Sequence, residues 1–79
     1  MAEPIYSPLP GTFYRSPSPG EPVFVEEGDA VSSGDVVGLV EVMKSYYEIT
    51  ASNDGTIERF LVGDGDPVDA GQAVAELRD

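Results

Sequence analysis

The chain has 79 residues and a formal net charge of −11, and it contains neither histidine nor cysteine. Its length allows one domain, and the missing residue types exclude disulfides and the triads built on histidine, which argues against an autonomous enzyme. The charge argues against nucleic acid and anionic membranes as partners, because both need a basic surface. We expect a soluble, cytoplasmic protein, since no apolar run is long enough to span a membrane. Because histidine and cysteine are missing, we expect no catalytic residues and no metal site.

Short strands separated by turns are predicted along the whole chain, and no segment has helical periodicity over three turns. Prolines at positions 4, 8 and 10 predict an extended lead-in, which we assign to residues 1–6, before a domain that covers residues 7–79. The expected strands and short apolar segments are residues 11–15, 23–25, 30–31, 36–51, 56–62 and 73–77. The sequence therefore predicts an all-β fold.

The second half of the chain repeats the first. Residues 28–34 align with residues 65–71 at an offset of 37, whereas residues 11–13 align with residues 55–57 at an offset of 44. The first half therefore carries seven extra residues, which coincide with the turn-rich segment at about residues 16–22. We expect two similar β-units related by a pseudo-two-fold axis, with this segment as an insertion.

Residues 36–51 are rich in Val, Ile, Tyr and Thr, but they are far more numerous than the roughly 5–6 residues of a typical strand. We therefore expect this segment to fold back as a hairpin with Met43 and Lys44 as its central turn residues. Tight hairpin turns prefer Asn-Gly or Asp-Gly, so Met-Lys indicates a functional constraint. The expected cross-strand pairs are Val42 with Ser45, Glu41 with Tyr46, and Val40 with Tyr47.

Lys44 is the only lysine of the chain and lies at the junction of the two predicted units. We expect the hairpin tip and the chain termini at opposite ends of the molecule. An exposed turn in an acidic chain offers no burial or cationic neighbour that would make the amine a base or a Schiff-base former. The position suits covalent loading instead, because a tethered group has a high effective concentration at each active site it reaches. An ordinary exposed lysine is the alternative.

Two motifs of the chain resemble those of a known family. Glu41-Val42-Met43-Lys44 is similar to the Glu-Ala-Met-Lys-Met attachment motif of biotinyl domains, with Val42 in place of alanine and Ser45 in place of the second methionine. Residues 7–19 resemble the Ser-Pro-Met-x-Gly-Thr-Phe-Tyr-Arg-x-Pro-Ser-Pro opening of the biotin carboxyl carrier proteins of bacterial acetyl-CoA carboxylase. The resemblance covers about residues 7–77.

The resemblance implies a flattened barrel-sandwich hybrid of two four-stranded antiparallel sheets. It implies biotin joined covalently to Lys44, with Val42, Met43 and Ser45 flanking the attachment point. The insertion would be the thumb, which projects near the biotin in carriers of the acetyl-CoA carboxylase type. The residues of this thumb are Ser16, Pro17, Ser18, Pro19, Gly20, Glu21 and Pro22.

The implied function is to carry carboxybiotin from a biotin carboxylase, which uses ATP and bicarbonate, to a carboxyltransferase. A biotin protein ligase would load the lysine. The implied setting is acetyl-CoA carboxylase and fatty acid biosynthesis, or a related stand-alone carrier, and the chain itself is either such a carrier or an excised domain. Glu41 and Glu48 would help a basic partner surface to dock, or form an ordinary solvated face.

Two other functions stay open. A lipoyl carrier would share the fold, but lipoyl domains typically have an Asp-Lys motif and lack a thumb, so Met43 and the thumb favour biotin. The second alternative is a degenerate module that is never modified and serves as a scaffold. Ser45, Tyr46 and Tyr47 support it, because they depart from the family pattern around the lysine.

Overall fold

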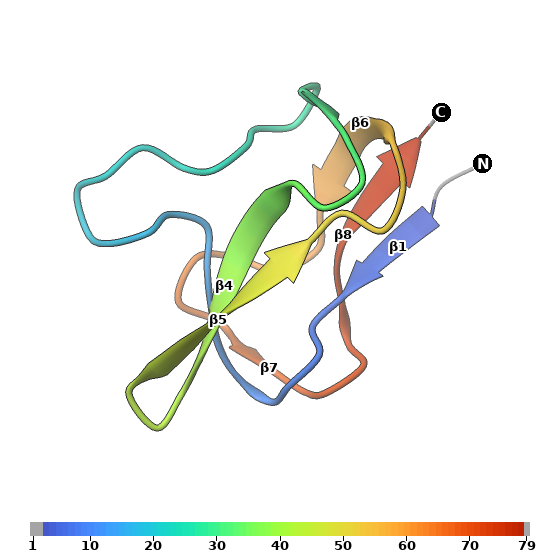
Figure 1. Cartoon of the computed structure of the whole chain (residues 1–79). Helices are drawn as coiled ribbons and strands as arrows, with labels where there is room; N and C mark the ends of the chain where they lie inside the picture. Colours follow the sequence, from blue (N-terminus) through green and yellow to red (C-terminus); the bar gives the residue numbers. More distant parts are fainter. Residues whose placement is uncertain (1–2, 79) are drawn as a thin grey trace.

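The computed structural model describes residues 3–78 as eight β-strands joined by turns and loops. The strands are β1 (Glu3–Tyr6), β2 (Gly11–Tyr14), β3 (Ala30–Val31), β4 (Val36–Val42), β5 (Ser45–Thr50), β6 (Gly55–Phe60), β7 (Pro67–Val68) and β8 (Ala73–Arg78). They form two four-stranded antiparallel sheets, ordered β1-β8-β6-β3 and β5-β4-β2-β7 (Figure 1). The expected all-β fold of two such sheets is confirmed. Within residues 3–78 there is no helix, and hence none that could cross a membrane.

The pseudo-two-fold symmetry is also confirmed. Shifting every strand of the first sheet by four places turns its order into that of the second sheet, so β1 corresponds to β5 and β8 to β4. Buried residues coincide at the two offsets found in the sequence. The coinciding pairs are Ile5 with Ile49 and Phe13 with Ile57 at 44, and Val31 with Val68, Val37 with Val74, and Val40 with Leu77 at 37.

The symmetry extends to the turns. The N–H of Phe13 donates to the carbonyl oxygen of Asp66 at 2.8 Å, and the N–H of Ile57 donates to that of Asp29 at 2.9 Å. The side chains of Asp29 and Asp66 each accept the N–H of the residue three positions earlier, at 2.9 and 2.7 Å. Aspartates in turns bond the local backbone in this way. The repeated turn residues therefore fix the same loop geometry in both units.

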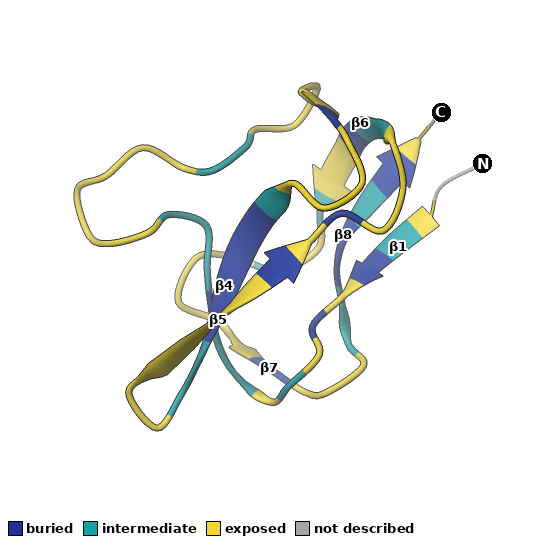
Figure 2. Cartoon of the chain, viewed as in Figure 1, coloured by how far each residue is buried: buried dark blue, intermediate teal, exposed yellow. Residues whose placement is uncertain are grey.

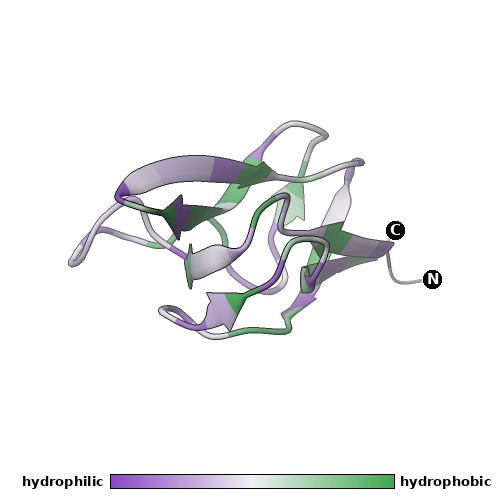
Figure 3. Ribbon diagram, turned by 90° about the horizontal axis from the view of Figure 1, so that it is seen from below, coloured by the Kyte–Doolittle hydropathy of each residue, from purple (hydrophilic) through white to green (hydrophobic). Residues whose placement is uncertain are grey.

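The core lies between the two sheets. β4 buries four consecutive residues, 37–40, and β8 buries Val74, Ala75 and Leu77. Figure 3 shows hydrophobic (green) and hydrophilic (purple) segments on the strands. Buried residues are concentrated on β4, β8 and the second half of β5, whereas the loops and the β4–β5 tip are largely exposed (Figure 2). The overall extents of 34 × 26 × 19 Å agree with a flattened barrel-sandwich.

Two segments differ from the expectation. Residues 3–6, assigned to the lead-in, form β1 and pair with β8, so they belong to the first sheet; residues 1, 2 and 79 lie outside the described part. The predicted strand at residues 23–25 is wrong, because these residues form no strand. In the second unit they correspond to residues 60–62, and β6 ends at Phe60. In the first sheet, the edge position beside β6 is occupied by β3, so residues 23–25 cannot pair there. Residues 15–29 therefore form one long loop (Figure 1).

One pair of core residues balances volume between the units. A Cβ added to Gly38 would lie 2.6 Å from Cε1 of Phe13 and 3.0 Å from the carbonyl oxygen of Tyr14. The positions that correspond to Phe13 and Gly38 in the second unit are Ile57 and Ala75. The first unit thus combines the large ring of Phe13 with a glycine, and the second unit combines the smaller side chain of Ile57 with an alanine. This exchange conserves the volume of the core.

We predict that Gly38→Ala lowers the free energy of unfolding by about 1–3 kcal/mol, because the methyl group overpacks the core against the Phe13 ring. Phe13→Ile should also lower it by about 1–3 kcal/mol, because it leaves a cavity. The double variant should lose less stability than the sum of the two single losses, because the alanine methyl group occupies space that the smaller isoleucine leaves. Urea unfolding of the four proteins measures this, and strict additivity would contradict the volume exchange.

Candidate functional site

The β4–β5 hairpin turns at two residues with left-handed backbone. Met43 and Lys44 have φ values of 51° and 69°, and they are the only non-glycine residues with positive φ in residues 3–78. Two such residues form a type I′ turn, in which a non-glycine residue costs about 1–2 kcal/mol. The expected register is confirmed. The pairs are Val42 with Ser45, Glu41 with Tyr46, and Val40 with Tyr47.

The tip of this hairpin projects into solvent. Met43 is 93% exposed, so burial of its side chain does not compensate the backbone strain. Figure 1 shows the turn at one end of the molecule, and the start of β1 and the end of β8 at the other, as the symmetry predicts. Strain that the local packing does not explain is a recognised mark of a functional position.

Lys44 is exposed and differs from the other basic residues in its surroundings. Arg59 and Arg78 form ion pairs with glutamates of neighbouring strands at 3.1 and 3.3 Å. The guanidinium of Arg15 stacks over the Phe60 ring at 4.2 Å. Neither of the two ion pairs within residues 3–78 includes Lys44. The tip therefore presents a primary amine that no carboxylate of this part of the chain holds.

The residues that flank the lysine fall into two groups. Val42 is half-buried and packs against the core, so it anchors the base of the hairpin. Met43 and Ser45 are exposed and open to a partner protein. Among residues 3–78, no group of three Asp or Glu side chains is arranged to hold a metal ion. The exposed tip offers the primary amine of Lys44.

The insertion at residues 16–22, which the sequence resemblance identifies as a thumb and which keeps that name below, is anchored at Arg15. The backbone N–H of Arg15 donates to Oδ1 of Asp64 at 2.7 Å, and its carbonyl oxygen accepts the N–H of Phe24 at 2.8 Å. Its Nη2 donates to the carbonyl oxygen of Val25 at 3.3 Å. The start and the return of the loop thus meet at one residue. The sequence reasoning did not identify Arg15 or Asp64 as anchors, although Arg15 directly precedes the turn-rich segment at residues 16–22.

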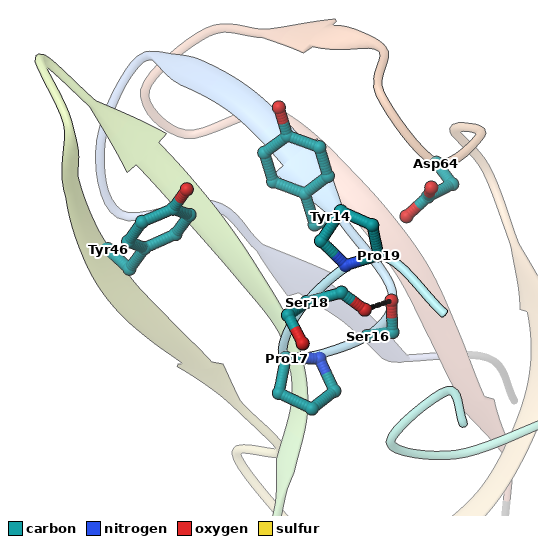
Figure 4. A pocket seen from close by; sticks show the side chains of 7 residues that line it. All are labelled: Tyr14, Ser16, Pro17, Ser18, Pro19, Tyr46 and Asp64. Atoms are coloured by element: carbon teal, nitrogen blue, oxygen red, sulfur yellow. Dashed lines mark hydrogen bonds between the residues drawn. The ribbon is translucent and has the colours of Figure 1, made fainter. Parts of the chain in front are cut away.

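The thumb and sheet β5-β4-β2-β7 border a groove of about 350 Å³ beside the hairpin (Figure 4). Its walls include the rings of Tyr14 on β2 and Tyr46 on β5, whose centroids lie 6.4 Å apart. The residues that line it are Tyr14, Ser16, Pro17, Ser18, Pro19, Tyr46 and Asp64. Four thumb residues therefore share a surface with Tyr46, which is two positions from Lys44.

Tyr14 joins β2 to the attachment hairpin. Its hydroxyl donates to Oε1 of Glu41 at 3.2 Å. Partial burial raises the pKa of this hydroxyl above its ordinary value, and the hydrogen bond to Glu41 adds to the rise. Tyr14, Glu41 and Tyr46 share the outer face of the sheet because β4 pairs with both β2 and β5. The sequence reasoning predicted the second pairing but not the first.

The family model and the curated relatives agree on the family of this chain. The model of the biotin-requiring enzymes matches residues 3–77. The chain is 54% identical over 65 residues to the biotin carboxyl carrier protein of acetyl-CoA carboxylase 2 of Arabidopsis thaliana, a chloroplast protein. It is 49% identical over 73 residues to the biotin carboxyl carrier protein of acetyl-CoA carboxylase of Pyropia yezoensis.

These alignments cover 82% and 92% of this chain, but only 26% and 46% of the two relatives. The chain thus spans less than half the length of either. Among solved structures, the urea carboxylase of Kluyveromyces lactis matches with a TM-score of 0.81 and 35% identity. That match covers 99% of this chain and 6% of the larger protein.

We predict that Met43→Asn raises the free energy of unfolding by about 1 kcal/mol, because asparagine adopts left-handed backbone more readily than methionine. The exposed Met43 side chain contributes little burial that the change could remove. Met43→Leu is the matched control, since leucine keeps the strain and should leave stability unchanged. Urea unfolding measures both, and equal stability of the Asn and Leu variants would contradict a strained turn.

Proposed function

The chain belongs to the family of biotin-requiring enzymes, and from this membership we propose that it is a biotin carboxyl carrier domain with Lys44 as the attachment residue. The observation that carries the proposal is the left-handed turn that presents the only lysine at the end opposite the termini. A loading site requires an exposed attachment residue at a fixed place, and the strained turn holds Lys44 at such a place.

The residues of the tip fit biotin. The Lys44 amine is exposed, so a biotin protein ligase can join it to the carboxyl group of biotin through an amide bond. Bound biotin supplies a ureido nitrogen that accepts and releases a carboxyl group. The role of the chain is then to hold the attachment point clear of the domain surface, on two strands whose register is fixed by the core.

The proposed partners are those of a carrier. A biotin carboxylase and a carboxyltransferase would act on the carried group, and the domain would move it between their active sites at a high local concentration. The absence of histidine and cysteine from the sequence supports presentation rather than catalysis by the domain itself. The names of the relatives favour the acetyl-CoA carboxylase type. A cytoplasmic location, which fractionation of the native host would test, belongs to the proposal.

The thumb completes the proposal. Its residues 16–19 share a groove with Tyr46, next to the hairpin that carries the lysine. A rigid loop at this place would restrict which modifying enzyme reaches the amine, and it therefore favours biotin over a lipoyl group.

We predict that Lys44→Arg abolishes biotinylation and leaves the fold intact, because arginine keeps the charge but has no acylable primary amine. Intact mass after incubation with a biotin protein ligase, ATP and biotin measures the loading, and circular dichroism measures the fold. Arg59→Lys in the same variant is the control: it places a lysine on the face of β6, where it should stay unmodified. Biotin remaining on Lys44→Arg would refute the assignment. A lipoyl-sized addition to the wild-type protein from its native host would instead identify it as a lipoyl carrier.

A second prediction concerns the thumb. Replacing residues 16–22 by a shorter turn, with Arg15 and Phe24 retained, should preserve cooperative unfolding, because the deleted residues contribute nothing to the buried core. The shortened variant should become a substrate for a lipoyl ligase that does not modify the wild type, as mass spectrometry would report. The same deletion combined with Lys44→Arg controls for modification elsewhere. A shortened variant that still excludes lipoate would show that the thumb does not select the ligase.

A further inference from the structure

The thioether of Met43 is open to solvent beside the attachment lysine. Its side chain is 93% exposed, more than any other large hydrophobic side chain in residues 3–78. Met43 belongs neither to the buried core nor to the hydrophobic residues that pack against it. Figure 2 shows the end of the β4–β5 hairpin in the colour of exposed residues. Met43 therefore adds nothing to the packing of the domain, and a reagent in solution can reach its sulfur.

The chain has few other side chains that an oxidant would consume. It contains no cysteine, tryptophan or histidine, and its second methionine is Met1, which lies outside the described residues. Ser45 stands where the family motif has another methionine, so the tip carries one thioether. Within residues 3–78, a mild peroxide has a single sulfur atom to attack.

Hydrogen peroxide converts a thioether to a sulfoxide in one step. The Met43 sulfur takes one oxygen atom, the O–O bond breaks, and the second oxygen leaves as water after a proton shift. The sulfur is oxidised by two electrons and the peroxide is reduced. A methionine sulfoxide reductase reverses the change with two thiols, which form a disulfide while the oxygen leaves as water. The sulfoxide side chain is polar and chiral, whereas the thioether is apolar.

The fold tolerates this change. The register of β4 and β5 is fixed by Val40 and Ile49, which are buried in the core away from the turn. The new oxygen stays in water with the exposed side chain, so the folded domain buries no unpaired polar atom. The chemical change is therefore confined to the tip, and Lys44 keeps its place.

The effect of oxidation falls on a partner that covers the tip. Contact with the thioether removes apolar surface from water, which is favourable. Contact with the sulfoxide desolvates a strong hydrogen-bond acceptor, which costs free energy. Oxidation therefore weakens such a contact while the amine of Lys44 and the fold stay unchanged.

We propose that Met43 is a reversible oxidation site that controls how well the loaded domain binds its biotin carboxylase. The proposal rests on the carrier function proposed above. The thioether form is carboxylated efficiently, and the sulfoxide form carries biotin but binds the carboxylase more weakly. A sulfoxide reductase restores the first form, because the side chain is as open to the reductase as to the oxidant.

The first measurement uses the unloaded full chain, so it does not depend on the carrier function. Hydrogen peroxide should oxidise Met43 at a rate close to that of free methionine, and peptide mass mapping separates Met43 from Met1. Urea unfolding of the oxidised chain should give an unchanged midpoint. Reductases for the two sulfoxide epimers should remove the oxygen from the folded protein.

The second measurement uses chain that is oxidised first and loaded afterwards, because the sulfur of biotin is itself a thioether that peroxide attacks. Intact mass confirms that a biotin protein ligase has loaded both the oxidised and the untreated chain. Each is then titrated as the substrate of a biotin carboxylase with ATP and bicarbonate. Oxidation should raise the KM for the carrier about tenfold, the scale of burying an unpaired polar group, with little change in kcat.

Two variants serve as matched controls. Met43→Leu cannot be oxidised at the tip, so peroxide treatment should leave its KM unchanged, although Met1 is still present. Met43→Gln has a side chain of similar length with a polar end, and it should reproduce the raised KM without peroxide. Both variants keep a non-glycine residue in the left-handed turn, so neither relieves the backbone strain.

Several results would overturn the proposal. Oxidation much slower than that of free methionine, or a loss of stability on oxidation, would contradict an open site that the fold tolerates. A rise in KM that also occurs in peroxide-treated Met43→Leu would assign the effect to Met1. Loading of the untreated chain alone would place the effect at the ligase. Equal KM values for the two loaded forms would overturn only the oxidation site's control, whereas a chain that the ligase loads in neither form would overturn the carrier function as well.

Discussion

The pairing of β4 with β5 is the constraint on which the rest of the structure depends. Val40 and Ile49 point into the core from these two strands and are almost completely buried. A slip of β5 by one residue against β4 would turn Ile49 to the solvent, so the register cannot change without loss of core packing. The fixed register leaves two residues for the turn, and a two-residue turn that matches the twist of the strands requires left-handed backbone. The conformation of Met43 and Lys44 is therefore imposed by the core at some distance from the tip.

The features that carry the proposed function lie where the two similar units differ. The β4–β5 turn has no covalent counterpart, because the corresponding strands β8 and β1 carry the chain ends. The loop after β2 is long and forms the thumb, whereas the corresponding segment after β6 is a short turn that ends at β7. Both differences affect sheet β5-β4-β2-β7, where the lysine, the thumb and the groove lie together. The other sheet supplies matched packing and carries both ion pairs of residues 3–78.

The sequence predicted what local patterns determine. The hairpin register followed from strand length and the position of the turn, and the symmetry followed from repeated Gly-Asp turns. The strand at residues 3–6 was not recognised. Pro4 is tolerated only in an edge strand, and the sequence does not show that this segment pairs with β8 at the edge of the first sheet. The groove was also missed. It depends on the β2–β4 pairing, which brings Tyr14 next to Glu41, and on Asp64, which is 49 positions from the residue it anchors.

The position of the chain ends determines how the domain would respond to mechanical load. Glu3 pairs with Leu77 on neighbouring antiparallel strands, so the start of β1 and the end of β8 lie at the same side of the molecule. A force that pulls these ends apart would break the β1–β8 hydrogen bonds one after another, beginning at that pair. The β4–β5 ladder lies in the other sheet and outside this line of force. A tether attached at either end could therefore be stretched or moved while the tip keeps its geometry.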